Sequence, residues 1–245
     1  MKSLTKLLLA AALVTGVNQV YARPVTPINA HSIETQDRHL SGFSGVVVAG
    51  SFDVYITQGS SESVKVVADE DVINKIITEV KDGVLKIYNK NTSSGFNWNW
   101  NESNKMKIYV SAKDLNKIVL SGSGDVFFKD GIRTQNLLVS VSGSGDIVGK
   151  VDVKNLESTV VGSGDVTLTG RAETSSVRVS GSGDYKGRAL VTANTTVKVV
   201  GSGDAAVYAS QKLDAAVAGS GDIRYTGGAK LVASSETGSG EIHRF

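Results

Sequence analysis

The four residues Gly122-Ser123-Gly124-Asp125 recur down the second half of the chain at a nearly constant interval. Later copies occupy residues 143–146, 162–165, 181–184, 201–204, 219–222 and 238–241, the last ending in Glu instead of Asp. Successive copies start 21, 19, 19, 20, 18 and 19 residues apart. Self-similarity at a period of about 20 residues indicates a solenoid, in which each repeat forms one coil.

The residues on either side of the phrase alternate between apolar and polar. The residue directly after the acidic position is apolar in every copy: Val126, Ile147, Val166, Tyr185, Ala205, Ile223 and Ile242. A period of two with β-branched residues predicts strands, and nothing recurs at the period of a helix. Each coil should therefore run strand, Gly-Ser-Gly corner, short strand and loop, with the apolar positions stacked inward. The sequence predicts an all-β parallel β-helix of about seven coils.

These repeats, following a β-rich N-terminal region, resemble the bacterial family described as "putative auto-transporter adhesin, head GIN domain". The resemblance covers roughly residues 41–245 and rests on seven in-register copies of the phrase. It implies a right-handed β-helix of ~19-residue coils and a secreted or envelope-associated protein. Adhesion follows from shape, and no catalytic residues are carried over.

The N-terminal residues carry the marks of an export signal. Lys2 and Lys6 precede an apolar run over residues 7–17, and Val20-Tyr21-Ala22 suits signal peptidase. We expect a signal peptide over residues 1–22, cleaved after Ala22. The run is too short to span a bilayer, and no other stretch of the mature chain should cross one. Export places the protein in the periplasm, the outer cell envelope or outside the cell.

Cysteine and charge narrow the functional classes. The chain contains no Cys, which excludes disulfides, thiol nucleophiles and a lipid anchor on Cys. The whole chain has 26 basic and 24 acidic residues; residues 1–22 hold two Lys and no acid, so the mature chain has 24 of each. A nucleic-acid partner is not expected, because phosphate binding needs a basic excess.

The chain before the repeats divides into two parts. Residues 23–40 contain both prolines and read as a leader. Residues 41–120 should form a β-rich cap over the first coil, with a repeat domain following over 121–245. Within the cap, Gly50-Ser51-Phe52-Asp53 looks like a worn copy of the phrase, residues 69–80 show the spacing of one helix, and Asp82-Gly83 predicts a turn.

The stretch over residues 91–104 is the first candidate site, because both tryptophans lie there among asparagines. Aromatic faces beside amides suit sugar rings, which makes Phe96, Trp98 and Trp100 candidate ligand-binding residues. Their period of two equally fits a hairpin that packs one aromatic face on the domain.

The acidic position of the phrase is the second candidate site. In stacked coils it forms a ladder: Asp125, Asp146, Asp165, Asp184, Asp204, Asp222 and Glu241. Neighbours about 4.8 Å apart repel by about 1 kcal/mol in water. The carboxylates could accept hydrogen bonds from backbone N–H groups at the corner, as a structural turn, or hold Ca²⁺ between coils. No other cofactor is indicated.

The sequence favours a non-enzymatic protein. A catalytic site should single out one coil, whereas the same Ser and an acidic residue recur in all of them. The leading hypothesis is an adhesin-like envelope protein that binds a glycan or a cell-surface protein. The alternatives are a periplasmic scaffold without a ligand and a carbohydrate-active enzyme. The sequence does not indicate an oligomeric state.

Overall fold

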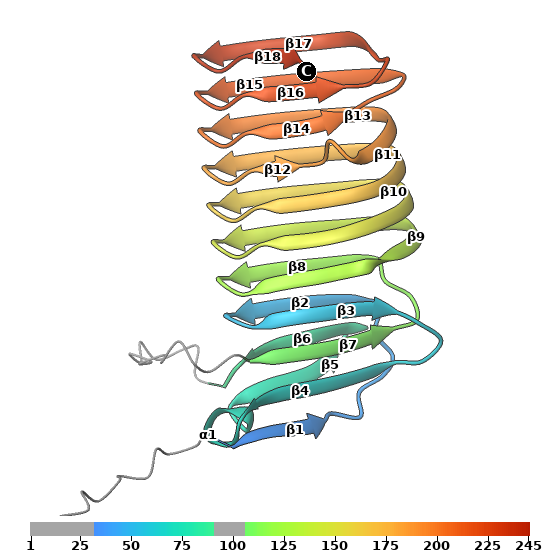
Figure 1. Ribbon diagram of the computed structural model, residues 1–245, viewed down its shortest axis with the longest axis vertical. Helices are drawn as coiled ribbons and strands as arrows, with labels where there is room; N and C mark the ends of the chain where they lie inside the picture. The colour runs from blue at the N-terminus through green and yellow to red at the C-terminus, as the bar shows by residue number, and fades with distance from the viewer. Residues whose placement is uncertain (1–31, 91–105) are drawn as a thin grey trace, which may run out of the picture. The chain divides into compact units, whose positions relative to one another are not determined.

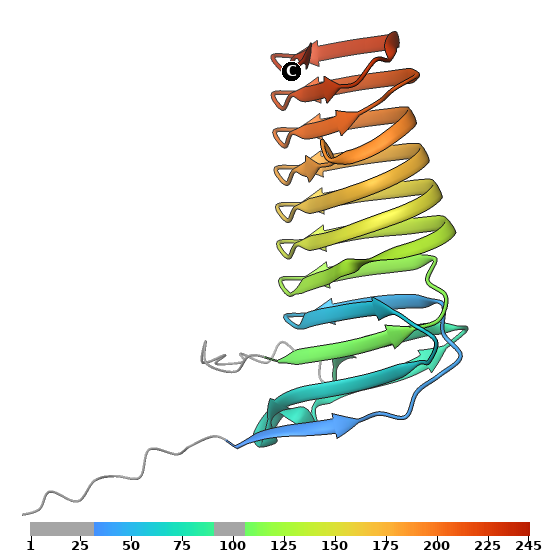
Figure 2. The same ribbon diagram turned by 45° about the vertical axis from the view of Figure 1, so that its right-hand side comes forward.

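The computed structural model describes residues 32–90 and 106–245, which form a parallel β-solenoid of about seven turns, as predicted (Figures 1 and 2). The N-terminal strands are β1 (Ile33–Asp37), β2 (Gly45–Gly50), β3 (Asp53–Gln58), β4 (Ser63–Asp69), β5 (Ile76–Lys81), β6 (Val84–Asn89), β7 (Lys107–Ala112) and β8 (Lys117–Gly122). The repeat strands are β9 (Asp125–Gly143), β10 (Ile147–Gly162), β11 (Val166–Gly181), β12 (Tyr185–Lys186), β13 (Leu190–Gly201), β14 (Ala205–Tyr208), β15 (Lys212–Gly219), β16 (Ile223–Thr226), β17 (Lys230–Gly238) and β18 (Ile242–Arg244).

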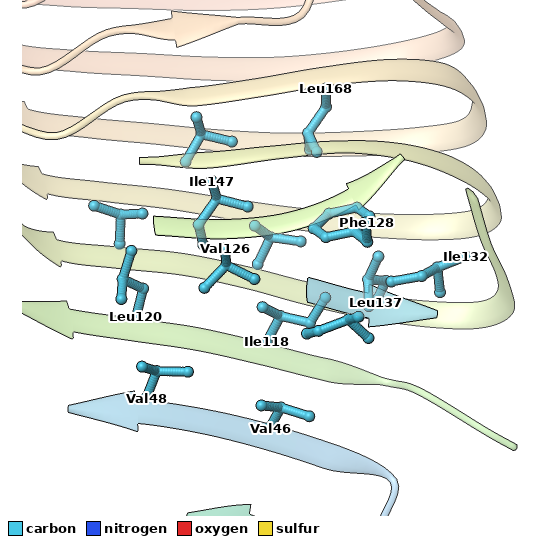
Figure 3. Packing of buried hydrophobic residues seen from close by; sticks show 14 of the residues in the cluster. Val46, Val48, Ile118, Leu120, Val126, Phe128, Ile132, Leu137, Ile147 and Leu168 are labelled. Carbon is cyan, nitrogen blue, oxygen red and sulfur yellow. The ribbon is translucent and has the colours of Figure 1, made fainter. Parts of the chain in front are cut away.

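The repeats stack residue upon residue. Gly122, Gly143 and Gly162 pair in register, and the same parallel pairing continues through the corners above them. The apolar residue after the acid is fully buried in each coil from Val126 to Ile223. Figure 3 shows two of these side chains, Val126 and Ile147, lying one above the other in the core. A single coil could not bury them alone, so the stack is the unit of stability.

The corner glycines are required by the close approach of successive coils. The first Gly of each phrase has a positive φ, which L side chains rarely adopt. The third residue is constrained by space: a Cβ on Gly145 would lie 1.9 Å from the carbonyl oxygen of Gly124. Two backbone N–H groups of each corner, such as Ser144 and Gly145, donate to one carbonyl of the coil before, here Gly122.

The segment Gly50-Ser51-Phe52-Asp53 is a copy of the phrase, which confirms that prediction. Gly50 pairs with Gly122 and Asp53 with Asp125. Phe52 takes the place of the third residue and is fully buried. On its other side the coil meets β6 and β7, which are joined by residues 90–106 and not by a four-residue corner. We attribute the tolerance of the bulky Phe52 side chain at this position to the longer connection between β6 and β7.

The first coils are not stacked in chain order. The coil of β2 and β3 pairs on one side with β6 and β7, and on the other with β8 and β9. In Figure 1 these blue strands lie between the green strands that follow them in sequence. Beyond β7, β4 and β1 continue the sheet in antiparallel pairings. The cap boundary predicted at residues 41 and 120 stays a prediction.

The helix predicted over residues 69–80 is largely wrong. Helix α1 covers only Glu70–Ile73, and strand β5 follows at Ile76–Lys81. β5 pairs with β6 in a two-residue hairpin whose turn residues, Asp82 and Gly83, both have positive φ. Such a turn matches the twist of the strands it joins. The β-branched residues that showed helical spacing therefore follow the hairpin and form a strand.

Several inward positions of the stack carry hydroxyl groups, and three of them lie together. Tyr185 is fully buried, and burial raises the pKa of its hydroxyl to about 12. The nearby hydroxyls of Ser158 and Ser175 counteract part of this rise in pKa. Within the described residues, none of the three oxygens has a partner at hydrogen-bonding distance and angle. The core of these coils therefore contains three hydroxyl groups whose hydrogen-bonding capacity is unsatisfied within the described residues.

At the C-terminal end the core becomes polar, as expected of a terminal coil. Ser234 and Glu236 stand at positions that are apolar in most coils, and both are exposed. Glu236 Oε1 accepts the backbone N–H of Ile242 at 3.1 Å. A charged side chain in this row of the last coil discourages the pairing of further strands.

Candidate functional site

The acidic ladder is built into the backbone of the corners. Oδ1 of Asp125 accepts the backbone N–H of Asp146 at 3.0 Å, and each later Asp accepts from the acid one coil further on at 2.8–3.0 Å, ending at Glu241. The bonds run between coils and not within one turn. They stabilise charged carboxylates, and the N–H of Glu241 is the largest cause of the lowered pKa of Asp222.

Two basic side chains, Lys186 and Arg224, form ion pairs with the acidic ladder. Lys186 Nζ is 2.5 Å from Asp165 and 3.8 Å from Asp184, and its hydrogen bond to Asp165 is the main cause of its raised pKa. Arg224 lies 3.4 Å from both Asp204 and Asp222. Within residues 32–90 and 106–245 no three His, Asp or Glu side chains are arranged to hold a metal ion. We propose a structural role for the ladder; calcium binding stays a prediction.

The other predicted site lies outside the described residues. This applies to Phe96, Trp98 and Trp100, and equally to the signal peptide over residues 1–22. Their roles stay predictions.

An aromatic surface that the sequence reading did not single out lies on the N-terminal coils. Tyr109 of β7, Tyr55 of β3 and Phe127 of β9 are paired in register, and their side chains point outward. The Tyr55 ring lies 5.3 Å from the Tyr109 ring and 5.2 Å from the Phe127 ring, at interplanar angles of 19° and 22°. Tyr109 is 43% exposed, and the other two are partly exposed. We call these three residues the aromatic ladder.

Cations and hydroxyls border the aromatic ladder. Lys65 of β4 stands opposite Tyr109 in the sheet, and Lys129 Nζ lies 5.5 Å from the centre of the Phe127 ring. A shallow cavity of about 400 Å³ lies beside the two tyrosines, with Thr57, Ser63, Lys65, Val110 and Ser111 also in its lining. The surface thus joins apolar ring area to hydrogen-bonding groups and positive charge.

The ring geometry indicates which ligands this surface suits. Because the rings lie over one another, much of their faces is covered, and edges and phenol groups are left to solvent. A sugar stacks on an open ring face, whereas exposed tyrosines with adjacent polar groups are typical anchors of protein interfaces. The ladder therefore favours a protein partner over a sugar ring.

The sequence spacing of two residues of the aromatic ladder indicates that they stack. Tyr55 follows Asp53 by two residues, as Phe127 follows Asp125. If residues 50–53 are aligned with residues 122–125, Tyr55 and Phe127 fall at the same position of successive coils, which predicts that their rings stack. Tyr109 could not be added, because the coil containing β7 has no phrase to align.

The fold and motifs agree with comparisons to known proteins. The model of the family described as "putative auto-transporter adhesin, head GIN domain" matches residues 42–229. The chain belongs to this family. A "putative adhesin" from Bacteroides fragilis is 26% identical, with a TM-score of 0.80, over 87% of this chain and 97% of that one. A "putative lipid binding protein" from Parabacteroides distasonis is 29% identical, with a TM-score of 0.72, over 89% and 98%. A "putative adhesin" from Parabacteroides merdae, at 20% identity, TM-score 0.70 and coverage of 88% and 97%, shows the same fold.

Two further findings concern this family member. None of the curated proteins matches the chain. Among the described residues, no helix combines the length and apolar character needed to cross a membrane.

Proposed function

We propose that this family member is an exported, non-enzymatic, adhesin-like protein that binds a cell-surface protein through its aromatic ladder. The observation that carries the proposal is the outward stack of Tyr109, Tyr55 and Phe127 with its flanking lysines. Rings exposed in a contiguous row are uncommon on a monomer surface unless they serve an interface. The family description and the adhesin names of similar structures support the same function.

The regularity of the stack supports a non-enzymatic role. The acidic groups that could act as catalysts repeat from coil to coil, and their Oδ1 atoms are engaged by backbone N–H groups. A site that used two of these carboxylates as general acid and general base would need them in differing environments. A periplasmic scaffold is the alternative function, and it predicts no surface binding at all.

The test is the binding of fluorescently labelled mature chain (residues 23–245) to two cell types, measured by flow cytometry. The cells are source cells lacking the gene and cultured epithelial cells. We expect binding to at least one type, lost when the cells are treated with trypsin and kept after periodate oxidation of their glycans. Loss after periodate alone would contradict a protein partner. No binding to either type would support the scaffold.

Variants locate the binding surface. Replacing Tyr55 and Tyr109 together by Ala should lower binding at least tenfold, since interface tyrosines often carry much of the affinity. The matched control is Thr167→Ala, an outward residue in the corresponding row of β11. Unchanged binding of the double variant, with the fold intact by circular dichroism, would show that the partner binds elsewhere.

A further inference from the structure

A polar groove follows the stack on strands that the aromatic ladder does not use. Asn136, Asn155, Thr174, Asn194 and Lys212 are paired in register on β9, β10, β11, β13 and β15. With Asn116 before β8, they line a cavity of about 660 Å³. Buried Leu137 and Leu156 contribute to its lining. The register from Asn136 to Lys212 crosses four coil spacings of about 4.8 Å, or about 19 Å.

The polar groups of this groove are held in place before any ligand arrives. Asn155 Nδ2 donates to Asn136 Oδ1 at 2.8 Å, and Thr174 Oγ1 donates to Asn155 Oδ1 at 2.8 Å. An Asn amide has two N–H donors and an acceptor oxygen with two lone pairs. Each amide therefore keeps hydrogen-bonding capacity beyond its bond to the next coil. A row of fixed donors and acceptors lowers the entropy cost of binding.

The chemistry of the lining narrows the ligand class. Of its fourteen residues only Glu157 and Lys212 carry charge, one of each sign, so a strongly charged ligand gains little. The strands beneath the groove are paired with neighbours along their length, so an added peptide strand finds no open edge to extend. Amides and hydroxyls beside the half-exposed side chain of Leu138 suit a ligand that has both hydroxyls and C–H faces. Neutral sugars have this combination.

We propose that the groove binds an unbranched, uncharged polysaccharide chain lying along the stack, with consecutive sugars facing consecutive coils. The site is separate from the aromatic ladder and does not depend on the function proposed for it. Asn155 and Thr174, at the middle of the groove, should contribute most to binding.

Isothermal titration calorimetry of the mature chain with cellohexaose, maltohexaose and β-1,4-mannohexaose, each beside its disaccharide, tests the proposal. We expect at least one hexasaccharide to bind with a Kd below 1 mM, and at least tenfold more tightly than its disaccharide, because the groove spans several coils. Hexagalacturonate, a charged hexamer, should bind no more tightly. Failure of all three neutral hexasaccharides, tighter binding of hexagalacturonate, or equal affinity for disaccharide and hexasaccharide would overturn the proposal.

Two variants tie binding to the groove. Replacing Asn155 by Ala and Thr174 by Val should weaken the hexasaccharide at least tenfold, since both exchange hydrogen-bonding groups for apolar ones. Thr167→Val, on another outward row of the same solenoid, should leave affinity within twofold. Asn194→Ala, nearer one end, gives a second measurement should the double variant melt earlier. Unchanged affinity in both groove variants would contradict the site.

Discussion

The backbone contact at each corner can be tested with one added methyl group. In Gly145→Ala the new Cβ would lie 1.9 Å from the carbonyl oxygen of Gly124, whereas ordinary contacts begin near 3.4 Å. The two coils would have to separate locally by about 1.5 Å, the difference of those distances. That shift would break the bonds from Ser144 N and Gly145 N to Gly122 O, now 2.9 and 3.1 Å, and the bond from Asp146 N to Asp125 Oδ1 at 3.0 Å.

The expected cost follows from these contacts. Three hydrogen bonds at about 1 kcal/mol each, and about 1–3 kcal/mol of overpacking, sum to about 4–6 kcal/mol. Lower entropy of the unfolded chain returns about 0.4–1 kcal/mol. The free energy of unfolding should therefore fall by about 3–5 kcal/mol, which lowers the melting temperature by roughly 6–20 °C for a domain of this size.

Urea and thermal unfolding followed by circular dichroism measure this change. Ser144→Ala is the matched control, because Ser144 is the exposed neighbour of Gly145 and its backbone N–H is retained. It should alter the free energy of unfolding by less than about 0.5 kcal/mol. A Gly145→Ala variant within about 1 kcal/mol of that control would refute the reasoning, since the coils could then separate without loss.

Other outcomes concern Phe52, Tyr185, the acidic ladder and the two tryptophans. Phe52→Gly restores the repeated phrase yet should cost about 3–5 kcal/mol in urea unfolding, because it leaves a cavity where a buried ring stands; no loss would show that the ring contributes nothing. Tyr185→Phe should equal or exceed wild-type stability at pH 7, since it removes an unsatisfied hydroxyl. As the pH rises from about 10, the pKa of the unfolded chain, to about 12, the folded pKa, wild type should lose up to about 3 kcal/mol of stability, and Tyr185→Phe should lack this loss. Adding Ca²⁺ or chelator should not shift the melting temperature if the acidic ladder is only structural. A rise with Ca²⁺ would indicate metal binding. Replacing Trp98 and Trp100 by Ala should lower the melting temperature if these rings pack, and weaken binding alone if they contact a ligand.

The repeat made most of the solenoid predictable from the sequence. The phrase fixes the register, and the residue after each acid identifies the core, because period and alternation are properties of the chain itself. The copy at Gly50–Asp53 was also recognisable, although Phe52 replaces a glycine. The helix prediction over residues 69–80 failed because their spacing fits a helix and their β-branched residues also fit a strand. Only pairing with strand β6 decides between the two.

Sites built from several coils were harder to predict. The aromatic ladder joins Tyr55 to Tyr109 across 54 positions of sequence, and their proximity depends on β2 and β3 being placed between later strands. The bonds of the acidic ladder were foreseen as backbone hydrogen bonds, but their direction from coil to coil follows only from the stacking geometry. Local patterns predict the coils, and contacts between coils require the order in which they are stacked.

Mechanical load would be resisted unequally along the stack. Among the strands of residues 32–90 and 106–245, the coil of β17 and β18 pairs only with β15 and β16, so a pull on the C-terminus can peel it away row by row. β2 and β3 are paired on both sides, by strands that follow them in the chain. A pull on the N-terminal side first peels β1 from β4 and must then shear both sets of rows that hold β2 and β3. In single-molecule stretching we expect low, regular steps from the C-terminal coils and one higher rupture from the N-terminal coils. A molecule held through its aromatic ladder would thus extend from its C-terminal coils before the coil of β2 and β3 yields.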